Sequence, residues 1–283
     1  MRVKFDRYKD GKKKALTMSY DDGNHADLRL LDIFNKYGIK GTFHFNSGRF
    51  SDWTVTPEQI RECYVGHEIS AHSLTHHFME QVPDEEIFYE VLEDRRRLEE
   101  ICGHPVCGAS YPQGTYSPEL AEKVRMLGWR YCRTTHATKK VALPDDFVLW
   151  HPTCHHKDPD LLTYLDKLRK SSRSLAVLYV WGHSYEFDKD NNWEIIEEFC
   201  REAGGDPDIW YATNIEIYDY VTALHALRFS VDRSLVQNPT ATDVWISARS
   251  TYDSPAGAAC IKVPAGALVN IAEEVRKHES EEQ

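Results

Sequence analysis

Residues 15–38 read ALTMSYDDGNHADLRLLDIFNKYG, and they contain one complete strand-helix unit. An apolar, β-rich run ends at two aspartates. Apolar residues at helical spacing then continue to Gly38, which favours the end of a helix. The same rhythm returns at residues 41–66, at 174–205 and elsewhere in the first 228 residues. Strands that alternate with helices predict an α/β fold with a mainly parallel sheet. Seven or eight such units favour closure into a barrel over an open sheet.

The pattern changes after about residue 229, so we expect the barrel in residues 1–228 and a small β-rich extension in 229–283. DVWISAR and ACIKVPAGALVNI resemble short antiparallel strands, and residues 275–283 are expected to be a polar tail. Stabilisation of the barrel or a subunit contact is the favoured role for this extension. Carbohydrate binding is the alternative, and Trp245 or Tyr252 could serve either purpose.

The composition excludes several classes of partner. A net charge of −11 disfavours binding to nucleic acid or to an anionic membrane. No apolar run approaches the roughly 20 residues that cross a bilayer. The seven cysteines are scattered without a CxxC pair, which is typical of reduced thiols. We therefore expect a cytoplasmic protein, and a homo-oligomer stays an open alternative.

Two histidines in HEISAHSLTH (residues 67–76) suggest a metal site. His72 and His76 are four residues apart, and this spacing predicts that both rings lie on one side of a helical turn. A further ligand is available in TMSYDDG, where Asp21 and Asp22 follow an apolar run and precede Gly23. Such a sequence is also common in turns. Both pairs nevertheless fall at predicted strand ends of one fold. An Asp/His/His set leaves positions open for water and substrate, as catalytic metal sites do.

These two stretches resemble the TFDDG and H-[ST]-x-x-H motifs of the polysaccharide deacetylases, the NodB-like carbohydrate esterase family 4. The resemblance extends over residues 15–185 and implies a distorted (β/α)7-type barrel. It also implies that Asp22, His72 and His76 bind a divalent metal ion and that Asp21 is the catalytic base. The ligand types favour zinc. Cobalt, nickel and manganese are the alternatives.

A third family motif, R-x-P-Y-G, resembles SYPQG at residues 110–114. Pro112 and Gly114 match it, whereas Ser110 replaces the arginine and Gln113 replaces the tyrosine. In the family, the backbone N–H at the tyrosine position helps to bind the oxyanion, so the resemblance implies this role for Gln113. The family's arginine holds the catalytic aspartate. Another group must therefore hold Asp21 here, or the base is tuned differently.

LAVLYVWGH (residues 175–183) matches a later family motif that ends in a histidine. The resemblance implies that His183 is the general acid for the leaving group. Trp181 shares a strand face with His183 and is expected to form a wall beside the site. Glu186 and Asp188 follow closely, and we expect them to be loop charges.

The family's fourth motif, an aspartate and a tryptophan, has no clear match. The corresponding region, residues 133–156, offers several candidates: His136, Asp145, Asp146, Trp150, His151, His155 and His156. For His155 and His156, a position in the substrate cleft and a place in a solvated loop are both open.

The predicted activity is metal-dependent removal of an acetyl group from an acetylated sugar, amino sugar or oligosaccharide. A related amidohydrolase acting on a small cyclic imide or formamide is the first alternative, because the third motif is altered. A carbohydrate-binding pseudoenzyme is the second alternative.

Overall fold

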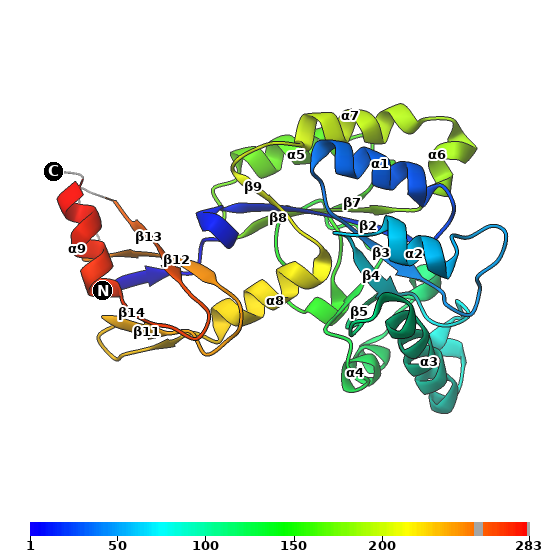
Figure 1. Cartoon of the computed structure of the whole chain (residues 1–283), viewed down its shortest axis with the longest axis horizontal. Helices are drawn as coiled ribbons and strands as arrows, with labels where there is room; N and C mark the ends of the chain where they lie inside the picture. The colour runs from blue at the N-terminus through cyan, green and yellow to red at the C-terminus, as the bar shows by residue number, and fades with distance from the viewer. Residues whose placement is uncertain (252–256, 282–283) are drawn as a thin grey trace.

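The computed structural model describes residues 1–251 and 257–281, and it contains a large curled sheet and a smaller β-rich part (Figure 1). The strands of the large sheet are β2 (Lys14–Asp21), β3 (Gly41–Phe45), β4 (Glu68–Ala71), β5 (Gly108–Ser110), β6 (Tyr131–Arg133), β7 (Cys154–His155), β8 (Ala176–Gly182) and β9 (Ile209–Tyr211). Their order is β6-β5-β4-β3-β2-β8-β7, with β9 paired to the start of β2, and every pairing is parallel.

Helices connect these strands and cover the outside of the sheet. They are α1 (Asp27–Tyr37), α2 (Pro57–Cys63), α3 (Asp84–Cys102), α4 (Pro118–Met126), α5 (Leu161–Lys170), α6 (Tyr185–Asp190), α7 (Trp193–Ala203) and α8 (Asn214–His225). Short 3₁₀ turns are η1 (Lys9–Gly11), η2 (Met79–Gln81), η3 (Pro112–Gly114) and η4 (Phe147–Leu149). Figure 1 shows α1, α5 and α7 together on one side of the sheet and α3 and α4 on the other.

Residues 150–155 draw the two edges of the curled sheet together. Trp150 forms a parallel bridge with Arg133 of β6, and its N–H donates to the carbonyl of Cys132 over 3.0 Å. Only a few residues later, β7 pairs with β8. The predicted (β/α)7-type fold is thereby confirmed, with a distorted closure in which one short segment touches both edges.

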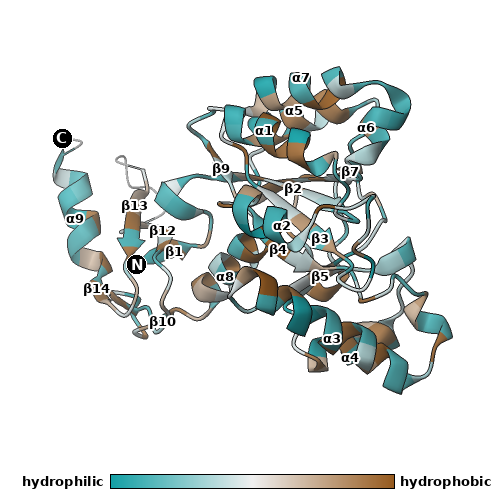
Figure 2. Cartoon of the chain, turned by 45° about the vertical axis from the view of Figure 1, so that its right-hand side comes forward, coloured by the Kyte–Doolittle hydropathy of each residue, from teal (hydrophilic) through white to brown (hydrophobic). Residues whose placement is uncertain are grey.

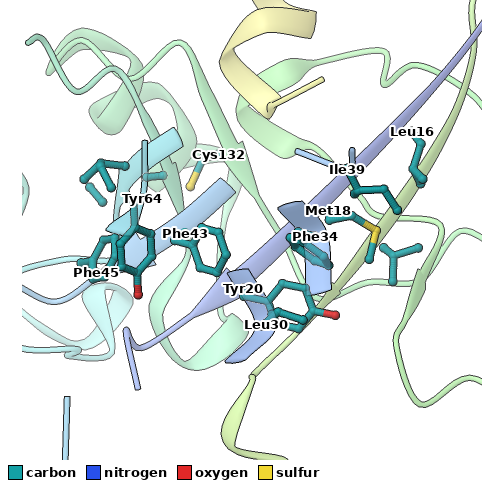
Figure 3. Close-up of a cluster of buried hydrophobic side chains, with 14 of the residues drawn as sticks. Leu16, Met18, Tyr20, Leu30, Phe34, Ile39, Phe43, Phe45, Tyr64 and Cys132 are labelled. Atoms are coloured by element: carbon teal, nitrogen blue, oxygen red, sulfur yellow. The ribbon is translucent and has the colours of Figure 1, made fainter. Parts of the chain in front are cut away.

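The outward face of β2 forms part of the main apolar core. Leu16, Met18 and Tyr20 are fully buried, and Figure 3 shows Met18 and Tyr20 beside Phe34 of α1. The ring centroids of Tyr20 and Phe34 are 5.8 Å apart. Burial of this apolar face fixes the register of β2, because a slip of one residue would expose it.

The opposite face of β2 is polar although it is buried. It carries Thr17, Ser19 and Asp21, and Thr17 Oγ1 donates to Asn214 Oδ1 over 2.7 Å. Side chains alternate between the faces of a strand. The apolar pattern at residues 16, 18 and 20 therefore directs Asp21 to the polar interior, at the carboxyl end of the sheet.

Two small antiparallel sheets and a helix form the β-rich part. One sheet contains β1 (Arg2–Lys4), β12 (Val244–Arg249) and β13 (Ala259–Val263); the other contains β10 (Arg228–Phe229), β11 (Leu235–Gln237) and β14 (Leu268–Asn270). The helix α9 (Ile271–Glu281) follows. The start of the chain thus pairs with a strand after residue 229, and the domain division at residue 228 stays a prediction. Tyr252 lies outside the described residues.

The expected polar tail is instead mostly helical. Within α9, Ile271 and Val275 are buried and the remaining positions are largely polar. Figure 2 shows hydrophilic and hydrophobic residues interspersed along this helix. Two apolar residues four apart give a single narrow stripe. That stripe was too short to indicate a helix against the charged residues around it.

Other expectations about the chain concern membranes and thiols. Within the described ranges, no helix is long and apolar enough to cross a membrane. All seven cysteines are free thiols, as their spacing predicted.

Candidate metal centre and active site

The candidate site lies where three parallel strands end. Asp22 follows β2, His72 follows β4, and His183 follows β8. Because these strands run in the same direction, their carboxyl ends lie at one edge of the sheet. Residues far apart in the sequence therefore meet there.

The structure brings Asp22, His72 and His76 together. Their ligand atoms all lie within 4.8 Å of one another. Asp22 Oδ1 is 3.9 Å from His72 Nε2 and 3.8 Å from His76 Nε2. This Oδ1 atom is buried, and no hydrogen-bond partner for it exists among the described residues. A buried carboxylate oxygen facing two imidazole nitrogens fits a divalent metal ion.

The second nitrogen of His72 supports this interpretation. His72 Nδ1 lies 3.0 Å from the carbonyl oxygen of Ser110, which can only accept a hydrogen bond. With the proton held on Nδ1, Nε2 keeps its lone pair toward Asp22 and His76. Metal-ligating histidines are commonly oriented in this way.

The predicted helical turn at His72 and His76 is wrong. Residues 72–76 form a loop, in which Ser73 and His76 both have a φ of 63°. The backbone groups of the loop bond to other elements: Asn46 Nδ2 donates to the carbonyls of residues 72 and 73, and Leu74 N–H donates to the Glu90 carbonyl over 3.1 Å. These contacts replace the bonds of a helix. The rings still meet, with their Nε2 atoms 3.1 Å apart.

Asp21 lies beside the ligand group and is only 2% exposed. Arg133 of β6 donates to its Oδ2, and Ser110 Oγ donates to its Oδ1 over 3.1 Å. Burial alone would raise the pKa of Asp21. The guanidinium of Arg133 and the nearby His72 outweigh burial and hold the pKa well below its usual range.

Arg133 is the group that replaces the missing motif arginine, and sequence reasoning missed it. Its side chain is fully buried, and it stacks over Trp181 with 4.4 Å between Cζ and the ring centroid. It comes from a different strand than the family motif predicts. The available signal was the charged residue itself, placed within the apolar strand sequence WRYCR.

The SYPQG segment contacts both candidate histidine ligands. Ser110 Oγ lies 2.7 Å from His72 Nδ1, so its hydroxyl links a metal-ligand candidate to Asp21. Gln113 is exposed with a φ of 59°, and its Nε2 lies 2.9 Å from His76 Nδ1. Pro112 begins η3, the tight turn that places Gln113 over His76.

His183 faces the same centre from the end of β8. Its Nε2 lies 4.0 Å from Asp22 Oδ2, and its Nδ1 lies 3.6 Å from Glu186 Oε2. Burial alone would lower the pKa of His183, but the carboxylates of Glu186, Asp21 and Asp22 raise it. Trp181 stands beside it, with 5.6 Å between the ring centroids.

Glu186 is more than the loop charge that the sequence suggested. It lies in the first turn of α6, and its Oε2 is 3.1 Å from His155 Nε2 and 3.2 Å from His156 Nε2. Its other oxygen is 3.2 Å from Lys157 Nζ. Burial would raise the pKa of Glu186, whereas the three surrounding imidazoles lower it well below its usual range. The only sequence signal was its position three residues after His183.

The adjacent histidines lie in different surroundings. His155 is partly exposed and packs edge-on against Trp181, with 4.7 Å between centroids. His156 is 1% exposed and stacks on Phe187 with 4.2 Å between the ring centroids, so neither expectation, a position in the substrate cleft or in a solvated loop, holds for it. A Cβ atom added at Gly182 would lie only 1.9 Å from Nδ1 of His156. The glycine therefore makes room for a buried ring.

His155, His183 and Glu186 form a second group whose ligand atoms lie within 4.8 Å of one another. Here the hydrogen bonding disfavours a metal ion. The N–H of Lys157 donates to His155 Nδ1 over 3.2 Å, so the proton of the neutral ring is on Nε2, facing Glu186. The ammonium of Lys157 also neutralises the carboxylate. The group is better described as a carboxylate that holds imidazoles in place.

Two other candidates for the fourth motif, Trp150 and Asp146, have structural roles. Trp150 is fully buried in the strand-edge bridge. Asp146 caps η4 through the N–H of Val148 and pairs with Arg125. Asp145 and His151 line a separate cavity, and the ring of His136 packs on His151 at 5.1 Å.

Two comparisons of sequence agree with this geometry. The family model described as polysaccharide deacetylase matches residues 8–132. A chitooligosaccharide deacetylase from Azorhizobium caulinodans is 25% identical over 185 aligned residues, which cover 59% of this chain and 85% of that protein.

Solved structures share the fold. A Mycobacterium smegmatis protein assigned to the polysaccharide deacetylases has a TM-score of 0.59 at 18% identity, over 77% of this chain and 93% of that one. The Xyl-CE4 domain of a multidomain xylanase from the hindgut metagenome of Trinervitermes trinervoides has a TM-score of 0.50 at 15% identity, over 74% and 92%. The motifs and the family-model match over residues 8–132 together confirm the resemblance of this chain to the polysaccharide deacetylases, and the solved structures share its fold.

Proposed function

We propose that this protein is a metal-dependent hydrolase that removes an acetyl group from an acetylated sugar, amino sugar or oligosaccharide. The observation that carries this proposal is the convergence of Asp22, His72 and His76, with the ionised Asp21 beside them. The similarity to a chitooligosaccharide deacetylase supports an acetylated carbohydrate as substrate. A cytoplasmic location stays a prediction from composition.

Asp22, His72 and His76 would hold the ion, and the mixed carboxylate and imidazole set favours zinc. When bound, the ion would polarise the acetyl carbonyl and acidify a water molecule. Three protein ligands leave room for both. Within this arrangement, the backbone N–H of Gln113 is the proposed donor to the developing oxyanion.

Asp21 is the proposed general base. Arg133 and Ser110 hold its carboxylate in one position, and the charge of Arg133 keeps it ionised, so it can accept a proton from the attacking water. Its Oδ2 lies 3.8 Å from His72 Nε2, about as close as Asp22 Oδ1 does, so the bonds to Arg133 and Ser110 rather than this distance support its role as base and not ligand.

His183 is the proposed general acid for the departing amine or alcohol. Glu186 faces its Nδ1, so its Nε2 is directed toward Asp22 and the reaction centre. The carboxylates around the ring favour the protonated imidazolium, which is the form that can donate a proton.

Glu186→Gln is expected to lower kcat about 10- to 100-fold while KM and metal content stay within twofold. The amide cannot hold the imidazole of His183 as the carboxylate does, and a small misplacement of an acid can cost about 10² in rate. Steady-state kinetics and metal analysis measure this. Glu197→Gln, on the exposed face of α7, is the matched control. An unchanged kcat would remove Glu186 from the proposed machinery.

Substrate assays test the proposed reaction. We expect acetate release from acetylated oligosaccharides, its loss after chelation, and its return when zinc is added to the chelated protein. Small cyclic imides and formamides are assayed alongside the acetylated oligosaccharides. Turnover of these alone would favour the amidohydrolase alternative. Metal binding without turnover of any substrate would favour the carbohydrate-binding pseudoenzyme, which the loss of the motif arginine had suggested.

A further inference from the structure

We propose that a cavity beside Asp22 binds a sugar residue that carries an anionic group, next to the acetylated residue of the same oligosaccharide. The proposal rests on the proposed function, and it names the class of substrate. The cavity has a volume of about 230 Å³. It is lined by Asp22, Asn46, Arg49, Ser51, Trp53 and Thr54.

The position of the cavity ties it to the reaction. Asp22 lines it and also belongs to the candidate metal-ligand set, so an occupant would be adjacent to the reacting acetyl group. The volume is below the roughly 300–1,000 Å³ of pockets that enclose a drug-sized ligand. It therefore suits one ring or one substituent of a longer chain that continues into solvent.

The wall of the cavity is fixed to the strand end that carries the two aspartates. Val55 N–H donates to the carbonyl of Gly23 over 2.9 Å, and Asn24 Nδ2 donates to the carbonyl of Trp53 over 2.8 Å. Ser51 and Thr54 bond to each other within the loop. These bonds preorganise the loop, so little ordering is needed when a ligand binds.

An aromatic surface runs from the cavity toward His183. Trp53 is 49% exposed, and its ring centroid lies 5.2 Å from that of Tyr185. Tyr185 in turn lies 5.2 Å from His183. Exposed tryptophan beside polar groups is typical of a binding surface rather than of a folding core. It offers a flat face on which a sugar ring can rest.

Arg49 gives this surface its preference for an anionic group over a neutral one. The side chain is exposed, and no carboxylate of the described residues lies within ion-pair distance of its guanidinium. Its backbone is held by a 3.0 Å bond from its N–H to the Asn46 carbonyl. In a chain of net charge −11, Arg49 is a cation that lines the cavity beside the candidate site. A guanidinium binds carboxylate and phosphate groups through paired hydrogen bonds.

The test compares matched oligosaccharides. One carries acetyl groups and a uronic acid, a second is the same compound with the uronate carboxyl reduced to an alcohol, and a third carries a phosphate or sulfate ester instead. We expect the intact protein to bind an anionic form at least tenfold more tightly than the reduced form, measured by calorimetry. Arg49→Gln is expected to reduce that ratio to within about twofold of unity.

Two further variants separate charge from stacking. Trp53→Ala is expected to weaken binding of the charged and reduced oligosaccharides by similar factors, because stacking does not depend on the anionic group. Arg201→Gln on α7, an exposed arginine of the same charge, is the matched control. Equal affinity of the intact protein for charged and reduced forms, or an unchanged ratio in Arg49→Gln, overturns the proposal.

Acetate release is measured on the same compounds, so the two proposals fail separately. Preferential binding that depends on Arg49, without acetate release, supports the anionic subsite and contradicts the hydrolase. Acetate release without preference for an anionic form supports the hydrolase and overturns the subsite. Tighter binding of the phosphate or sulfate ester than of the uronate identifies that ester as the anionic group that Arg49 binds.

Discussion

Asp21→Asn is expected to lower kcat by about 10³-fold while the protein still binds one metal ion per chain. The amide has nearly the shape of the carboxylate, but it cannot accept a proton from the attacking water. The proposed ligands Asp22, His72 and His76 are unchanged by this substitution. Metal analysis of the purified variant and acetate release under saturating substrate measure the two effects.

Stability needs a control in this experiment. Asp21→Asn leaves the fully buried Arg133 without its anionic partner, and breaking a buried pair costs about 3–5 kcal/mol. The double variant Asp21→Asn/Arg133→Met removes both charges and is expected to recover much of that stability without recovering turnover. Near-normal turnover in the correctly folded single variant would refute the assignment of Asp21 as the base.

Asp22→Ala is expected to abolish both metal binding and turnover. The substitution removes the only carboxylate of the proposed ligand set, and two imidazoles that remain in an open cleft bind a divalent ion far more weakly. Equilibrium dialysis with zinc and acetate release measure the outcome. If the variant kept stoichiometric metal of unchanged affinity, the proposed ligand set would be wrong.

The backbone at Asp22 calls for a second variant. Its φ is 73°, a left-handed conformation that costs alanine roughly 1–2 kcal/mol but is tolerated by asparagine. Asp22→Asn keeps this conformation and removes the negative charge. We expect it to lose metal affinity like the alanine variant while its thermal midpoint stays closer to that of the unchanged protein.

Short motifs carried much of the information about the site. Asp21 and Asp22 end a strand whose alternating pattern is clear, and Gly23 follows them. His183 follows the apolar run AVLYVW and a glycine, which predicts a strand end, whereas His72 follows the shorter and more polar strand sequence EISA. The edge of the sheet at which these residues meet was therefore predictable from the order of strands and helices.

The loop geometry was not predictable in the same way. Spacing alone suggested a helical turn for His72 and His76, but Asn46 and Glu90, distant in sequence, supply the backbone partners that shape a loop there. Residue spacing indicates which backbone hydrogen bonds can form within one segment. It does not indicate hydrogen-bond partners that a distant segment provides.

The sequence by itself determined the parallel α/β barrel, the strand ends at which the candidate site lies and the residue types available for a metal ion, because periodicity and motif order are local properties of the chain. Only the tertiary structure decided which charged groups form ion pairs or hydrogen bonds with the residues of the candidate site. Arg133 reaches Asp21 from a strand more than a hundred positions away, and Glu186 gathers His155, His156 and His183. The curvature of the sheet brings distant strand ends close together, so charged residues on different strands can pair there.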